Sequence, residues 1–184
     1  MKYNFKNKVV LVTASTKGIG FAIAEEFLAN DAKVIICSSN KSNIQNANKI
    51  LIKKYDKKNF LILKCNLEKP DEILHMIDQI KKKFSSSIDI LINNSGGPKV
   101  KNIINTNIND WQRAIKINLL STIIVTKLLL PKMIKKKWGR IINLTSSTAK
   151  EPVKGMSLSN VTRAGVVSFG KTLSKELSGS GITV

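Results

Sequence analysis

A glycine-containing segment at residues 13–20, TASTKGIG, is the first stretch of the chain whose residue types could do chemistry. It follows a β-branched run and opens a segment of helical period, which places it at a strand-to-helix turn. Glycines at such a turn let the backbone approach a pyrophosphate, and the helix N-terminus adds N–H donors and the positive end of the helix dipole. The segment therefore predicts a nucleotide-phosphate site.

A second polar segment, SLSNVTRAG at residues 157–165, places Ser159 and Arg163 four residues apart. This spacing puts both side chains on one face of a helix. An arginine supplies several N–H donors and a permanent positive charge, whereas an aliphatic hydroxyl is a weak acid.

The elements that must position these residues alternate along the chain. We expect strands at 8–13, 33–37, 60–65, 88–92 and 140–144, a sixth beginning at Ile182, and helices at 18–30, 41–55, 70–84, 109–137 and 158–177. The last helix is expected to bury an apolar stripe at Leu158, Val161, Phe169, Leu173 and Leu177. Near-continuous apolar strands separated by helices predict an α/β fold with a doubly wound parallel sheet of the Rossmann type. We expect one domain over residues 1–184, with its ligand crevice at the carboxyl ends of the strands.

The formal net charge of +19 comes almost entirely from 28 lysines, against 3 arginines. A nucleic-acid groove usually also shows arginines or interleaved aromatic residues, so a solvated lysine-rich face is the preferred interpretation. The runs at residues 81–83 and 135–137 both lie near expected helix C-termini, where cations complement the helix dipole. The composition predicts no nucleic-acid partner.

The chain also lacks the usual sequence signs of a membrane span, a secretory signal or a metal site. Its longest apolar run, 117–130, is interrupted by polar residues, and its N-terminus shows no small-residue cleavage site. Two cysteines, Cys37 and Cys65, and the single His75 are too few for a zinc site or a disulfide framework. We expect a cytoplasmic protein without a metal ion, with His75 at the surface.

Four motifs in order along the whole chain resemble those of the short-chain dehydrogenase/reductase family. TASTKGIG resembles the family's TGxxxGIG, and NNSG at 93–96 resembles its NNAG. Trp111 followed by Ile-Asn-Leu at 117–119 resembles the helix that carries a catalytic asparagine, and GRIINLTSS at 139–147 with a downstream AG and GITV resembles the region of the catalytic serine. Ala14 replaces the first glycine of the loop, which is tolerated if its φ stays negative and otherwise costs about 1 kcal/mol or more.

The resemblance implies hydride transfer between a nicotinamide cofactor and a small-molecule carbonyl or alcohol, such as a 3-oxoacyl thioester. The implied cofactor-binding residues are Thr13, Ser15, Lys17, Gly18, Ile19, Gly20, Ser39, Asn66, Leu67, Asn94, Ser95, Gly96 and Arg163. The implied catalytic residues are Asn118, Ser146, Ser159 and Arg163, with Ser147 as the near alternative to Ser146.

Two of these positions depart from the family's pattern. Ser159 stands where the family has a proton-donating tyrosine, and Arg163 where it has a lysine. The two tyrosines of the chain, Tyr3 and Tyr55, lie elsewhere in the sequence. Two hypotheses follow: an active carbonyl reductase, or a catalytically impaired nucleotide-binding homologue that acts as a sensor or subunit partner.

The end of the expected second strand, residues 37–41, carries no acid that would bind the ribose 2′-OH of NAD and repel a 2′-phosphate. Lys17 adds a cation that resembles the family's NADP-type basic residue, so NADPH is favoured over NADH. Asn66 lies where the family commonly has an aspartate that contacts the adenine amine. The resemblance also implies a homodimer or homotetramer, and a chain that lacks the C-terminal part of the family's fold, since it stops within the sixth strand.

Overall fold

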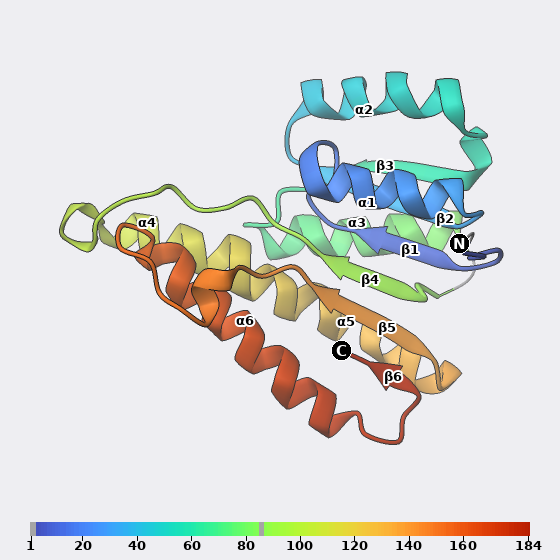
Figure 1. Ribbon diagram of the computed structural model, residues 1–184. Helices are drawn as coiled ribbons and strands as arrows, with labels where there is room; N and C mark the ends of the chain where they lie inside the picture. The colour runs from blue at the N-terminus through green and yellow to red at the C-terminus, as the bar shows by residue number, and fades with distance from the viewer. Residues whose placement is uncertain (1–2, 85–86) are drawn as a thin grey trace.

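Six parallel strands form a sheet with the spatial order β3-β2-β1-β4-β5-β6 in the computed structural model of this chain (Figure 1). The structure describes residues 3–84 and 87–184. The strands are β1 (Val9–Val12), β2 (Lys33–Ser38), β3 (Phe60–Lys64), β4 (Ile90–Asn93), β5 (Gly139–Asn143) and β6 (Ile182–Thr183). Because the order reverses between β1 and β4, the carboxyl ends of these two strands flank the crevice where such sheets bind ligands. The predicted doubly wound parallel sheet is confirmed.

Helices cover both faces of this sheet. They are α1 (Gly18–Ala29), α2 (Lys41–Lys54), α3 (Pro70–Lys83), α4 (Ile108–Ala114), α5 (Ser121–Lys136) and α6 (Ser157–Glu176), with short 3-10 turns η1 (Lys57–Asn59), η2 (Ile103–Asn105) and η4 (Ser147–Ala149). Helices α1 and α2 pack on one face, and α3, α5 and α6 pack on the other (Figure 1). The expected strands and helices are present, with ends within two residues of those predicted.

The core divides into two layers because side chains alternate along each strand. In β1, Val9 and Leu11 join the cluster beneath α3, α5 and α6, whereas Val10 and Val12 join the cluster beneath α1 and α2. All four are 2% exposed or less. Burial on both faces explains why this strand reads as an unbroken apolar run rather than an alternating one.

The helix predicted at 109–137 contains a π-helical turn, η3 (Ile115–Leu120), between α4 and α5. The hydroxyl of Ser121 donates to the carbonyl of Ile117, and the hydroxyl of Thr122 donates to the carbonyl of Asn118 at 3.1 Å. These hydroxyls provide partners for carbonyls in a stretch where the regular α-helical hydrogen bonds are interrupted. Single π-helical turns within α-helices are frequent at functional sites.

The combined helix from Ile108 to Lys136 is long and apolar enough to cross a membrane, with a mean hydropathy of 1.6 in its most apolar window. Its apolar side chains Val125, Leu129 and Met133 are buried in the cluster that covers the sheet. The core helices of soluble domains meet the same criteria of length and composition.

The apolar stripe predicted for α6 is only partly correct. Leu158, Leu173 and Leu177 are buried as expected, but Val161 is 55% exposed. Thr162 takes a fully buried position on this helix, and its hydroxyl donates to the carbonyl of Leu158 at 2.7 Å. A threonine that satisfies its own hydroxyl within the helix can occupy a position where pattern analysis expects an apolar residue.

Charged residues cluster at helix ends. The lysines at 81–83 lie in the last turn of α3, and Lys135 and Lys136 lie in the last turn of α5, as predicted. Lys136 also pairs with Asp89, a carboxylate that is 1% exposed and accepts a hydrogen bond from the backbone N–H of Val9 at 2.8 Å. This pair joins the end of α5 to the base of β1.

Candidate active site

The glycine loop has the backbone conformations of a close-approach turn. Gly18 adopts φ +59°, a left-handed value that favours glycine. Gly20 needs the absence of a side chain, since an added Cβ would lie 2.6 Å from the Asn94 amide nitrogen and 2.9 Å from the Ser15 Cα. Ala14 adopts φ +45°. Alanine in place of the family's glycine was expected to be tolerated only at a negative φ, so this replacement costs stability here.

A tether from the end of β4 holds this loop in place. The Thr13 hydroxyl donates to the carbonyl of Asn94 at 2.6 Å and accepts from its backbone N–H at 2.9 Å. The side-chain amide of Asn94 donates to the carbonyls of Thr13 and Ala14 at 3.1 and 2.9 Å. The Ser15 side chain is buried and donates to the carbonyl of Val12 at 2.6 Å. These three polar side chains therefore support the loop from within the protein.

A cleft of about 420 Å³ runs from the glycine loop to helix α4. Of the predicted site residues, Lys17, Ser39, Asn66, Leu67, Gly96 and Asn118 line it. The remaining predicted residues do not line the cleft within the described ranges: Thr13, Ser15, Gly18, Ile19, Gly20, Asn94, Ser95, Ser146, Ser159 and Arg163. The Ile19 side chain is 72% exposed to solvent.

The end of the cleft at β2 and β3 is polar and includes residues that the sequence motifs did not single out. Asn40 caps α2, with its side-chain oxygen accepting from the N–H of Asn43 at 2.9 Å, and both residues line the cleft. The side-chain oxygen of Asn66 accepts from the N–H of Glu68 at 3.0 Å. Asn66 was predicted, whereas Asn40 and Asn43 could have been found from topology, because residues that follow adjacent parallel strands meet at one edge of the sheet.

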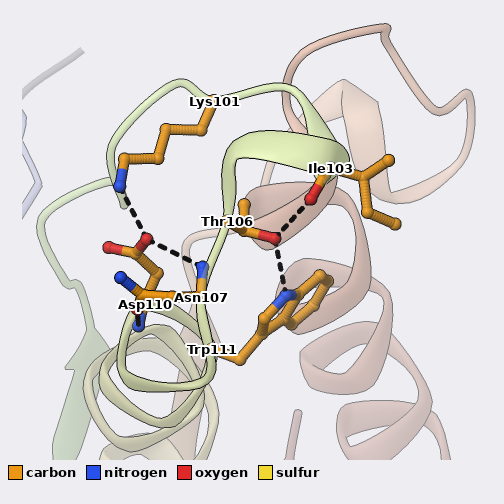
Figure 2. Close-up of polar contacts among 6 residues, drawn as sticks. All are labelled: Lys101, Ile103, Thr106, Asn107, Asp110 and Trp111. Atoms are coloured by element: carbon orange, nitrogen blue, oxygen red, sulfur yellow. Dashed lines mark hydrogen bonds and ion pairs between the residues drawn. The ribbon is translucent and has the colours of Figure 1, made fainter.

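Helix α4 and the loop before it form the opposite wall, and Asp110 organises that wall (Figure 2). Its carboxylate accepts from Lys101 at 2.6 Å and from the backbone N–H of Asn107 at 3.2 Å, completing a capping box. The hydrogen bond from Lys101, followed by that from Asn107, holds the pKa of Asp110 below its usual value. The Trp111 ring donates to the Thr106 hydroxyl at 3.0 Å, so the loop is fixed to the helix at two points.

Arg113, one turn beyond Asp110 on α4, pairs with Glu68 at 3.1 Å. Both residues line the cleft, and they come from elements on its two sides. The motifs predicted neither Arg113 nor Glu68. Arg113 could have been found from its spacing, because it lies three residues after Asp110 on the same helix face.

A polar network joins the ends of β4 and β5 to α6 and η3. The Ser95 hydroxyl donates to the side-chain oxygen of Asn118 at 2.7 Å. The Arg163 guanidinium donates to the carbonyl of Leu144 at 2.8 Å and to that of Ser95 at 3.4 Å. Arg163 is 8% exposed, and this burial lowers the pKa of its guanidinium. The structure thus brings together Ser95, Asn118 and Arg163.

Ser146 and Ser159 do not take part in that network. The Ser146 hydroxyl accepts hydrogen bonds from the N–H and hydroxyl of Thr148 at 3.3 and 3.1 Å. Ser147, the alternative to Ser146, is exposed and begins η4. Ser159 is 7% exposed on α6, one turn before Arg163. Helix α6 lies close to η3 at Gly165, where an added Cβ would lie 3.1 Å from the Leu119 side chain.

Cys37 and Cys65 are free, buried thiols at the ends of β2 and β3. The thiol of Cys65 and the backbone N–H of Ala14 lower the pKa of Cys37, whereas the hydrogen bond to Cys37 and burial raise that of Cys65. His75 is exposed beside Gln79, as expected. Residues 3–84 and 87–184 contain no cluster of three histidine, cysteine or acidic side chains that could hold a metal ion.

Comparisons with known proteins agree with this geometry. The profile of the short chain dehydrogenase family matches residues 8–184. The chain is 34% identical to the 3-oxoacyl-[acyl-carrier-protein] reductase FabG of Aquifex aeolicus, over 100% of this chain and 73% of the relative. It is 36% identical to the Haemophilus influenzae FabG, over 97% of this chain and 72% of the relative.

Two solved structures share the fold over nearly the whole chain. A short chain dehydrogenase from Bacillus anthracis superposes with a TM-score of 0.89 at 31% identity, covering 96% of this chain and 73% of that one. The L-sorbose reductase of Gluconobacter frateurii, solved with NADPH and L-sorbose, superposes with a TM-score of 0.91 at 26% identity, covering 99% of this chain and 68% of that one. The matched sequence, the switch-point cleft and the tethered glycine loop together show that the chain belongs to the short-chain dehydrogenase/reductase family of oxidoreductases.

Proposed function

We propose that this protein is an NADPH-dependent reductase of a small-molecule carbonyl, with a 3-oxoacyl thioester as the first substrate class to test. The observation that carries the proposal is the cleft, which runs from a glycine loop with a pyrophosphate-type turn to the buried amide of Asn118. Gly20 supports the loop's shape, because a Cβ there would lie 2.6 Å from the Asn94 amide nitrogen that holds the loop. The FabG relatives are named for reduction of 3-oxoacyl groups.

The preference for NADPH is supported by the charges around the end of β2. Ser39, Asn40 and Asn43 line the cleft there, and no carboxylate stands at the strand end to repel a 2′-phosphate. Lys17 lines the same end of the cleft and supplies a cation within the glycine loop. The sorbose reductase neighbour was solved with NADPH. We expect NADPH to bind about tenfold or more tightly than NADH, and Lys17→Ala to remove most of that difference.

When bound, NADPH supplies a hydride to the carbonyl carbon. In the proposed reaction Ser146 polarises the carbonyl oxygen, while Arg163 provides a fixed positive field and organises the nicotinamide ribose. The guanidinium has five N–H donors, of which two reach the carbonyls of Leu144 and Ser95, so donors remain for a ligand. Ser159 is too weak an acid to take the place of a tyrosine, so the proton comes by way of water.

The test is turnover of NADPH by the protein with a panel of ketones that includes a 3-oxobutanoyl thioester. We expect measurable wild-type turnover, a large loss in Ser146→Ala, and a smaller loss in Ser147→Ala. Absence of turnover across the panel, with NADPH still bound, contradicts the proposal.

A second candidate function, a nucleotide-binding homologue with little or no catalysis, is favoured by one observation. Arg163 is committed to two backbone carbonyls, which makes it a clamp between the ends of β4 and β5 as well as a ligand candidate. Turnover that appears only in the double variant Ser159→Tyr, Arg163→Lys would support this alternative.

We also propose a cytoplasmic protein that assembles as a homodimer or homotetramer. Exposed apolar residues on α5 and α6, including Ile134, Val161 and Val167, support an association of these helices with a second copy. Sedimentation of the protein above the mass of its 20.4 kDa monomer tests the assembly.

A further inference from the structure

The side-chain nitrogen of Asn118 has no hydrogen-bond partner in the described part of the chain. The residue is 1% exposed, yet it lines the cleft. A buried amide N–H is normally paired, and each exception in a native structure calls for an explanation. A donor without a protein partner at a cleft wall indicates that a ligand atom accepts its hydrogen bond.

Ser95 contacts the oxygen end of the Asn118 side chain. Its hydroxyl donates to the side-chain oxygen of Asn118 at 2.7 Å, which leaves the nitrogen without a partner. The backbone carbonyl of Ser95 accepts from Arg163, which fixes the segment that carries the hydroxyl. The family's NNAG motif has alanine here, so this hydroxyl is a departure of the present chain.

Both oxygen atoms of Asn118 are already engaged. The side-chain oxygen accepts from Ser95, and the backbone carbonyl accepts from the Thr122 hydroxyl at 3.1 Å. The side-chain nitrogen is therefore the one polar side-chain atom of Asn118 that has no partner among the described residues. The complementary ligand atom is a hydrogen-bond acceptor. In a carbonyl reduction the carbonyl oxygen is the acceptor on which negative charge develops.

We propose that the Asn118 carboxamide donates a hydrogen bond to the substrate's carbonyl oxygen, and that Ser95 is a positioning residue that holds the amide in this orientation. The inference rests on the proposed function, because it requires a carbonyl substrate. As hydride adds to the carbonyl carbon, the electron pair of the C=O π bond moves to oxygen, and the resulting alkoxide takes its proton from water. A preorganised amide N–H stabilises that oxygen without giving up its proton.

The experiment compares four variants with the wild type: Asn118→Ala, Asn118→Asp, Ser95→Ala and Ser95→Thr. The readouts are kcat and KM with NADPH and a 3-oxobutanoyl thioester, the dissociation constant of NADPH from fluorescence, and the pH profile of kcat. Ser168→Ala, an exposed position on α6, is the matched control. Circular dichroism verifies folding, and Ser95→Ala keeps the test valid if the Asn118 variants do not fold.

We expect Asn118→Ala to lower kcat by about 100-fold or more at every pH, the usual cost of removing one such donor. Asn118→Asp should have a kcat as low as that of Asn118→Ala at neutral pH. Its kcat should rise as the pH falls, because the new carboxyl then becomes protonated and can donate a hydrogen bond. Ser95→Ala should lower kcat by about 10-fold with KM little changed, Ser95→Thr should restore it, and NADPH binding should change by less than about twofold.

Other outcomes overturn the inference. If the wild type reduces the thioester and Asn118→Asp keeps its kcat at neutral pH, the inference is wrong while the proposed function stands. A loss of NADPH affinity equal to the loss of kcat assigns the amide to the cofactor instead. If the wild type reduces no ketone, both the proposed function and this inference are wrong.

Discussion

The side-chain amide of Asn94, directly after β4, donates to the backbone carbonyl of Ala14 in the glycine loop at 2.9 Å. A second donation from the same nitrogen reaches the carbonyl of Thr13 at 3.1 Å. The shape of the phosphate loop is therefore set by a residue about 80 positions later in the chain. This connection crosses the point where the strand order reverses.

Asn94→Ala should loosen the glycine loop, because it removes the side-chain donor from two carbonyls. We expect a fall of about 1–2 kcal/mol in the free energy of unfolding. We also expect NADPH to bind about tenfold more weakly. Urea titration and fluorescence titration measure the two effects. Asn46→Ala, at an exposed position on α2, should leave NADPH binding unchanged and raise the free energy of unfolding by about 0.5 kcal/mol, because alanine favours the helix.

Ala14→Gly should stabilise the protein, because φ +45° is unfavourable for a residue with a Cβ. The gain is up to about 1 kcal/mol, reduced by the greater freedom of glycine in the unfolded chain. The matched control is Ala22→Gly, on an exposed face of α1, which should cost about 1 kcal/mol. Thermal unfolding of the two variants should therefore shift in opposite directions, and a shift of both to lower temperature would contradict the argument.

Gly20→Ala should displace the loop, since its Cβ would lie 2.6 Å from the Asn94 amide nitrogen. We expect a loss of about 1–3 kcal/mol in stability, as is usual for overpacking, together with weaker NADPH binding. The double variant with Asn94→Ala relieves part of the clash, so its loss should be smaller than the sum of the single losses. Strict additivity would show that the two side chains do not interact.

The Lys101–Asp110 contact predicts a pH-dependent stability. The pKa of Asp110 is lower in the folded state than its ordinary value of about 4, so its stabilising contribution is complete above that value. The contribution is lost as the pH falls through the lowered folded-state pKa, because the unfolded chain then binds the proton more readily. Asp110→Asn should flatten this acid limb in a series of urea titrations.

The sequence was sufficient for the parts of the fold that depend on local pattern. Apolar strands of four to six residues, helical periods and a glycine loop in the right context predicted the parallel sheet and its ligand edge. The local sequence pattern did not indicate in which direction the polar side chains of the glycine loop point. Thr13 and Ser15 stay predicted cofactor-binding residues, and the pattern did not indicate that their hydroxyls bond to the carbonyls of Asn94 and Val12.

The remaining features depend on contacts between distant segments. The Ser95–Asn118 hydrogen bond joins residues 23 positions apart, and the π-helical turn that contains Asn118 replaces a regular pattern that the sequence otherwise supports. Val161 has the right spacing for the core but lies at the surface, because Thr162 packs inward instead. No periodicity argument distinguishes these alternatives, since they depend on which tertiary neighbour is present.

The close packing of Gly165 against Leu119 has a consequence for how this chain could diverge. An added Cβ would lie 3.1 Å from the leucine side chain, so the absence of a side chain at 165 lets α6 lie close to the turn that carries Asn118. Arg163, on the same helix, donates hydrogen bonds to the carbonyls of Leu144 and Ser95. Divergence at 163 therefore also removes a link between α6 and the ends of β4 and β5, whereas the close approach at 165 does not depend on that side chain.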